Sequence, residues 1–96
     1  MPYTSAGTQI PLIKDLLADV KTPEWYRLGL ELTNDENGMR IIRKDHGHRV
    51  QDALEATFNL WLKKTTDPTP SWWGVVDALR RIEENKLAGD IEEKYC

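Results

Sequence analysis

The residues best suited to chemistry in this sequence are Asp45, His46 and His48, which share one short polar segment. Imidazole and carboxylate groups are, with thiolates, the usual protein ligands of zinc. However, two histidines separated by a single glycine supply only part of a site, and nothing elsewhere in the sequence offers convincing third and fourth ligands. We therefore predict no metal site, and we interpret residues 45–48 as a polar turn between helices.

A second set of ionisable residues, Asp90, Glu92 and Glu93, could provide the paired carboxylates of an acid–base catalyst. They fall near the end of the last predicted helix, where we expect them to be solvated. The sequence shows no Ser-His-Asp or Cys-His arrangement with a plausible pocket, and no glycine-rich phosphate loop. We predict that the chain is not an enzyme and that it needs no cofactor.

The third feature is a block of positive charge that directly follows a block of negative charge. Residues 23–36 carry a net charge of −3, and residues 37–50 carry +3 with the histidines neutral. The positive block contains Arg40, Arg43, Lys44 and Arg49. One alternative is a small helical domain that binds nucleic acid through residues 40–49. The net charge of −3 for the whole chain opposes that reading, whereas neighbouring blocks of opposite charge favour a protein partner, including a second copy.

Apolar residues recur at helical spacing along most of the chain, and no alternating strand pattern is found. The pattern predicts six short helices: residues 10–20, 23 to the polar break at 34, 37–45, 48–64, 71–83 and 85–95. Thr22, Ser71 and Asn85 are the predicted N-caps. Short connections favour antiparallel neighbours. The expected fold class is all-α, a six-helix antiparallel bundle over residues 10–95, preceded by a flexible arm over residues 1–9.

The helical stripes also predict which large side chains form the core. Core positions include Trp25, Met39, Ile42, Phe58, Trp61, Trp72 and Leu79. Gly29 lies beside the apolar face of its helix, which suggests that a neighbouring helix passes close to it. Tyr26 and Trp73 fall off the stripes of their helices, so they are either interface aromatics or partly buried residues at the rim of the core.

Location is constrained only by composition. No apolar run is long enough to span a bilayer, so no membrane insertion is expected. The single cysteine, Cys96, cannot form a disulfide within the chain, and a reduced, cytoplasmic setting is the simplest interpretation.

Four pieces of the helical pattern occur in an order that resembles the death domain family. The second helix carries a Trp followed by Leu-Gly and Leu, and the fourth carries an apolar residue three positions before a Trp. The fifth opens with a small capping residue and ends Ala-Leu-Arg, and the sixth carries Leu-Ala with an apolar residue three positions later. The matching residues are Trp25, Leu28, Gly29, Leu32, Phe58, Trp61, Ser71, Ala78, Leu79, Arg80, Leu87, Ala88 and Ile91.

The resemblance implies a module that binds other death domains, on itself or on a signalling adaptor or receptor, in apoptotic or innate-immune signalling. It also implies charged contacts that join the second and third helices of one domain to the first and fourth of another, with a homo-oligomer as one product. On this chain that points to Arg40, Arg43 and Lys44 as the basic side. The acidic side would come from Asp15 and Asp19 of the first helix, or from Asp52 and Glu55 of the fourth.

Overall fold

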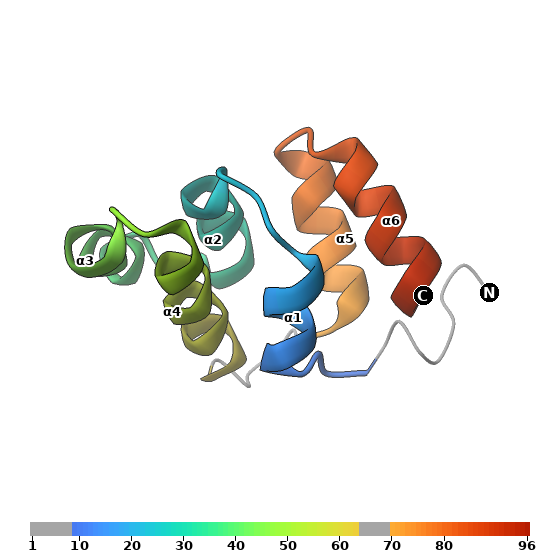
Figure 1. Cartoon of the computed structure of the whole chain (residues 1–96), viewed down its shortest axis with the longest axis horizontal. Helices are drawn as coiled ribbons and strands as arrows, with labels where there is room; N and C mark the ends of the chain where they lie inside the picture. Colours follow the sequence, from blue (N-terminus) through green and yellow to red (C-terminus); the bar gives the residue numbers. More distant parts are fainter. Residues whose placement is uncertain (1–8, 64–69) are drawn as a thin grey trace.

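The computed structural model describes residues 9–63 and 70–96, which form six α-helices and no strand (Figure 1). The last residue of the predicted helix 48–64, most of the break predicted at residues 65–70, and residues 1–8 of the predicted arm lie outside the described residues. In chain order the helices are α1 (Ile13–Asp19), α2 (Trp25–Thr33), α3 (Glu36–His46), α4 (Val50–Lys63), α5 (Trp72–Arg81) and α6 (Asn85–Tyr95). The predicted all-α, six-helix fold is confirmed.

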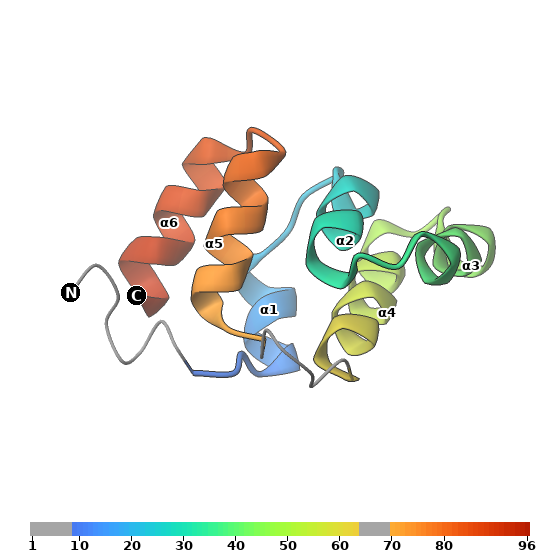
Figure 2. The ribbon, with the colours of Figure 1, turned by 180° about the vertical axis from the view of Figure 1, so that it is seen from behind.

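The helices are distributed along an elongated body of 41 × 28 × 23 Å, not in chain order. α3 and α4 lie at one end of the long axis, α5 and α6 form a pair at the other end, and α1 and α2 lie between them (Figures 1 and 2). α4 contacts α1, α2 and α3, whereas α6 packs mainly against α5. α3 and α6 are therefore the two outermost helices, at opposite ends of the domain.

The core contains the large side chains that the helical stripes predict. Trp25, Trp61 and Trp72 are each at most 6% exposed, and Phe58 and Leu79 are completely buried. Tyr95 of α6 stacks on Trp72 of α5, with ring centroids 3.7 Å apart. Burial of these large side chains contributes to the hydrophobic stabilisation of the domain.

The first helix is shorter than predicted. It begins at Ile13 rather than at residue 10, so Pro11 precedes the helix instead of lying in its first turn. Ile10 and Leu12 are 55% and 58% exposed. The apolar spacing continues into the segment before α1, but Leu12 has an extended backbone (φ −84°, ψ 141°) and is the N-cap, so the helix begins only after it.

Two of the three residues predicted as N-caps do not occupy the N-cap position of their helix in the structure. The Thr22 hydroxyl accepts a hydrogen bond from the Glu24 backbone N–H at 3.1 Å, but α2 begins only at Trp25, after one turn. Asn85 is the first residue of α6, and Glu84 takes the N-cap position without a side-chain bond. The Ser71 prediction is confirmed, because its Oγ accepts from the Gly74 N–H at 3.1 Å. That bond orders a first turn which contains a glycine.

Gly29 marks a close contact between helices, as predicted. A Cβ at this position would lie 2.6 Å from Met39 Sδ of α3 and 2.8 Å from Thr57 Cγ2 of α4. Both neighbours are completely buried. The absence of a side chain at Gly29 thus allows α3 and α4 to pack directly against the α2 backbone.

Candidate protein-interaction surface

The basic residues of interest are presented by α3, whose ends are well defined. Asp35 Oδ1 accepts a hydrogen bond from the Gly38 N–H at 2.9 Å and so caps the first turn. Cationic residues occupy the last turn, where they complement the negative end of the helix dipole. Met39 and Ile42 are buried, so the helix turns Arg40 and Lys44 outward.

The three cations on α3 differ in their contacts. Arg40 forms an ion pair with Glu36 at 2.5 Å on the helix surface. The guanidinium of Arg43 lies over the ring of Tyr26 from α2, 4.8 Å from its centroid. Lys44 takes part in no ion pair within the described residues. The predicted basic patch and the predicted interface aromatic Tyr26 therefore form one continuous surface across α2 and α3.

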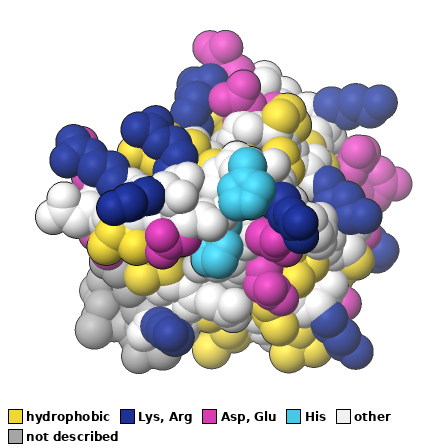
Figure 3. All heavy atoms as spheres, turned by 60° about the vertical axis from the view of Figure 1, so that its left-hand side comes forward, with side chains coloured by type: hydrophobic (Ala, Val, Ile, Leu, Met, Phe, Trp, Pro, Cys, Tyr) yellow, Lys and Arg dark blue, Asp and Glu magenta, His cyan; other side chains and the backbone are white. Residues whose placement is uncertain are grey.

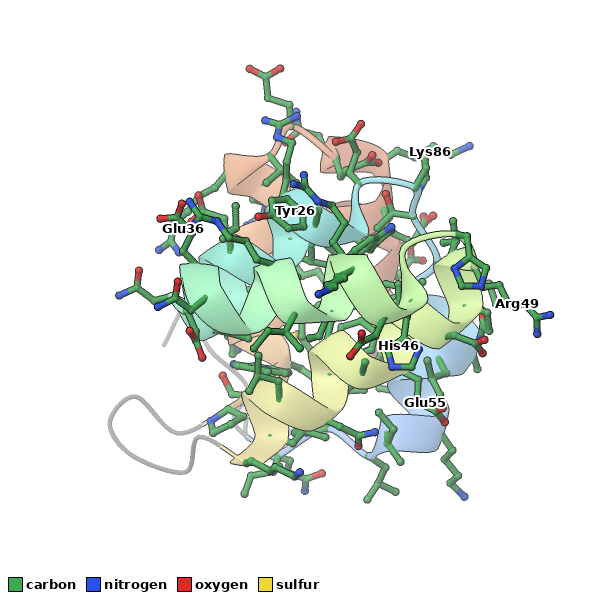
Figure 4. The ribbon with its side chains drawn as sticks, turned by 90° about the vertical axis from the view of Figure 1, so that its left-hand side faces the viewer. Tyr26, Glu36, His46, Arg49, Glu55 and Lys86 are labelled. Carbon is green, nitrogen blue, oxygen red and sulfur yellow. The ribbon has the colours of Figure 1, made fainter. Side chains whose placement is uncertain are left out.

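Figure 4 looks directly onto α3 and shows this surface. Tyr26 lies on the α2 side of the helix, Glu36 at one end, and His46 and Arg49 at the other, with Arg49 projecting away from the domain. Figure 3 shows the same end of the domain from a slightly different direction, with Lys and Arg side chains on its surface and histidines and carboxylates among them. The surface is therefore mixed in charge, with an excess of cations on α3, rather than uniformly basic.

An exposed apolar side chain, Ile41, lies among these cations. It is 61% exposed, the largest value among the exposed large hydrophobic side chains of the described residues. The spacing that predicts Met39 and Ile42 on the inward face of the helix also turns Ile41 outward. Ile41 carries neither charge nor an aromatic ring, the two properties that indicated interface residues in the sequence, so it was not predicted there.

The four predicted acidic partners are not equivalent. Asp19 accepts hydrogen bonds from Tyr95 Oη and from Lys94 Nζ, the latter at 3.1 Å, and so ties the end of α1 to the end of α6. The bond from Tyr95, followed by that from Lys94, lowers the pKa of the Asp19 carboxyl below its ordinary value. Asp19 therefore already has a structural role inside the domain.

The other three carboxylates lie on or near the surface. Asp52, in the first turn of α4, forms an ion pair with Arg49, with Oδ2 and Nη1 4.0 Å apart. Glu55 of α4 is exposed and Asp15 of α1 is partly exposed. Figure 4 shows Glu55 on the same side of the domain as His46. Asp52 and Glu55 are therefore the most accessible of the predicted acidic residues, and Asp15 is less exposed.

Trp73 and Tyr26 are both partly buried and pack against the edge of the core. Trp25 contributes to the position of Tyr26, because the two rings meet edge to face with centroids 5.7 Å apart. Both residues therefore fit the predicted alternative of rim aromatics, and Tyr26 additionally supports Arg43.

Two further properties of the described residues are relevant to this site. No group of three or more His, Cys, Asp or Glu side chains in residues 9–63 and 70–96 is arranged to hold a metal ion. No helix in the same ranges has the length and apolar character needed to cross a bilayer.

Exposed arginines beside a tyrosine ring are typical of protein–protein interfaces. A model of the death domain family matches residues 12–95, nearly the whole chain. The chain therefore belongs to the death domain family, whose members bind other death-fold domains rather than catalyse reactions. No curated protein and no solved structure matches the sequence significantly.

Proposed function

We propose that this domain assembles with other death domains, its own copies included, through the cationic surface of α3, and that it does so in cytoplasmic signalling of the apoptotic or innate-immune type. The observation that carries the proposal is the outward side of α3, where Arg40, Ile41 and Lys44 are all exposed. The core does not require these side chains, because Met39 and Ile42 alone anchor the helix inward.

The contacts of the cations support an interface role. Arg40 is held only by a solvent-exposed ion pair with Glu36, and such pairs contribute about 0–1 kcal/mol. A carboxylate of a partner can therefore replace Glu36 at small cost. Arg43 is oriented by Tyr26, which reduces the side-chain entropy that binding must remove.

The nucleic-acid alternative is less well supported by this surface. Glu36 and Asp45 lie on the same helix as the cations, and Asp52 lies close to Arg49. Phosphate binding favours a surface on which cations are clustered without such carboxylates. A DNA shift assay at low and high salt separates the two functions, and we expect no salt-dependent shift.

The test of the proposal is a charge reversal, Arg40→Glu with Lys44→Glu, in the purified domain. We expect self-association, measured by sedimentation, to weaken at least roughly tenfold, which corresponds to about 1.4 kcal/mol. Helicity and melting should stay close to those of the parent, because neither side chain is buried. Raising the salt concentration should weaken the association of the parent domain as well.

The matched control reverses two exposed cations elsewhere, Lys14→Glu with Lys21→Glu. It changes the net charge by the same amount but leaves α3 intact, so we expect assembly to persist. Equal loss in both variants would show that total charge matters rather than the α3 surface. Unchanged binding of both variants to themselves and to other death domains would contradict the proposal.

A further inference from the structure

The outer side of α6 is a second exposed helix surface, at the opposite end of the domain from α3 (Figures 1 and 2). Because Ala88 and Ile91 are buried against the domain, α6 presents Lys86, Gly89, Asp90 and Glu93 to solvent. Asp90 and Glu93 take part in no ion pair within the described residues. A Cβ at Gly89 would meet nothing within 4 Å, so the backbone is open to close approach there.

The outer side of α3 repeats the spacing found on α6. Each helix turns by about 100° per residue, so positions n, n+3, n+4 and n+7 form one outward strip. On α6 this strip is Lys86, Gly89, Asp90 and Glu93, and on α3 it is Asn37, Arg40, Ile41 and Lys44. The α6 strip carries two carboxylates and one cation, whereas the α3 strip carries two cations and no carboxylate.

The two strips are complementary when the helices lie face to face and parallel. Positions n and n+7 lie on the midline of each strip, so in the parallel arrangement each faces its counterpart, and Lys44 lies opposite Glu93. Positions n+3 and n+4 lie on opposite sides of the midline, so position n+3 of one helix faces n+4 of the other. This places Arg40 opposite Asp90 and Ile41 over Gly89. An antiparallel arrangement would instead set Lys44 opposite Lys86, so the charges select the parallel one.

We propose that α6 of one copy is the docking surface for α3 of the next copy, with Ile41 seated on Gly89 between the pairs Arg40–Asp90 and Lys44–Glu93. This inference rests on the proposed function and names the counterpart of the α3 surface. Because the two strips lie at opposite ends of the domain, the contact is heterologous and repeats from copy to copy. The product is a head-to-tail assembly, a filament or a ring according to the rotation between copies, rather than an isologous dimer.

The contacts that hold α6 in place leave this strip accessible. Arg80 pairs with Glu92, and Lys94 binds Asp19, so these neighbours of Asp90 and Glu93 serve the fold. Docking therefore uses carboxylates with no role inside the domain. One helix on one helix is a small interface, and interfaces of this kind are weak. We expect assembly to become measurable at high protein concentration and to depend steeply on it.

The experiment exchanges the charges of the two strips. Arg40→Glu with Lys44→Glu, and separately Asp90→Lys with Glu93→Lys, should each weaken self-association at least roughly tenfold. The domain that carries all four substitutions should recover it, because both pairs are restored with opposite sign. Failure of the fourfold variant to recover assembly, in a domain that melts like the parent, would overturn the pairing.

A steric variant tests the seat of Ile41 independently of charge. Gly89→Gln should leave melting unchanged or raised, because Gly89 is exposed and an added Cβ meets nothing within 4 Å, yet it should block assembly. If Gly89→Gln assembled like the parent, Ile41 would not be seated there.

A third variant distinguishes the failure of this inference from the failure of the proposed function. Asp15→Lys, Asp52→Lys and Glu55→Lys together reverse the predicted acidic residues of α1 and α4 other than Asp19, which binds Tyr95 and Lys94, and we expect this variant to assemble normally. If this variant failed while the α6 variant assembled, α3 would dock on α1 and α4, and only the α6 inference would be wrong. If neither variant nor the α3 reversal changed assembly, the proposed function would fail as well.

Discussion

Replacing a helical glycine by alanine should have opposite effects at two positions of this domain. In a helix interior, alanine is favoured over glycine by about 1 kcal/mol. Gly89→Ala should therefore be more stable than the parent by about that amount, because the added methyl group meets no neighbour within 4 Å. Gly29→Ala has the same gain in helix propensity, but the added methyl group would overlap the end of Met39 and lie 2.8 Å from Thr57 Cγ2.

The magnitude at Gly29 follows from the packing around it. Met39 and Thr57 are completely buried, so neither can move into solvent. Overpacking of this kind costs about 1–3 kcal/mol, and the overlap involves two neighbours, so we take the upper part of that range. After the helix-propensity gain, Gly29→Ala should be less stable than the parent by about 1–2 kcal/mol. The two alanine variants should therefore differ by about 2–3 kcal/mol.

Urea unfolding measures both variants, with the midpoint reporting stability and an unchanged slope reporting a similar unfolded state. Met39→Leu added to Gly29→Ala shortens the overlapping side chain, so it should recover at least about 0.5 kcal/mol beyond additivity. If Gly29→Ala were as stable as Gly89→Ala, the close approach of α3 and α4 to the α2 backbone would be wrong.

Three further outcomes follow from the packing and hydrogen bonds. Glu83 has a φ of 67° at the end of α5, where the Glu84 N–H bonds to the Leu79 carbonyl; Glu83→Gly should therefore raise stability by about 1 kcal/mol in urea unfolding, and an unchanged midpoint would refute this. Trp61→Ala should cost about 3–5 kcal/mol, and a loss below about 1 kcal/mol would contradict the α4 core face. Tyr95→Phe should cost about 1 kcal/mol at neutral pH; because the pKa of Asp19 is lowered from 3.8, this difference should shrink as the pH falls below that value, and a constant difference would contradict the Asp19–Tyr95 bond.

The sequence was sufficient to predict the helices whose buried face runs through several turns. In α4, Ala53, Leu54, Thr57, Phe58 and Trp61 fall on one side and all are buried. In α3, Met39 and Ile42 gave the correct inward face although the helix is short and polar. Periodicity works in these cases because the partner of the apolar face is the core itself, whatever the neighbouring helices are.

The helix ends were predicted less well, and the contacts of Asp19 inside the domain were not predicted. Ile10 and Leu12 continue an apolar pattern that the structure leaves exposed, since burial depends on where α1 meets its neighbours. Asp19 was predicted at an interface, but it binds Tyr95 and Lys94, which lie more than seventy residues away in the chain. Sequence spacing cannot reveal such long-range partners, and the complementary strips on α3 and α6 became apparent only once both helices were placed.

The central claim is that the outward side of α3 is the surface through which this domain associates. The most direct measurement is a concentration series of amide NMR spectra of the unmodified domain. We predict that the amide signals that move with concentration are those of residues 37–44 of α3 and 86–93 of α6, while buried α5 positions such as Leu79 stay unchanged. Shifts confined to other surfaces, or no shifts at any concentration or on addition of another death domain, would contradict the account.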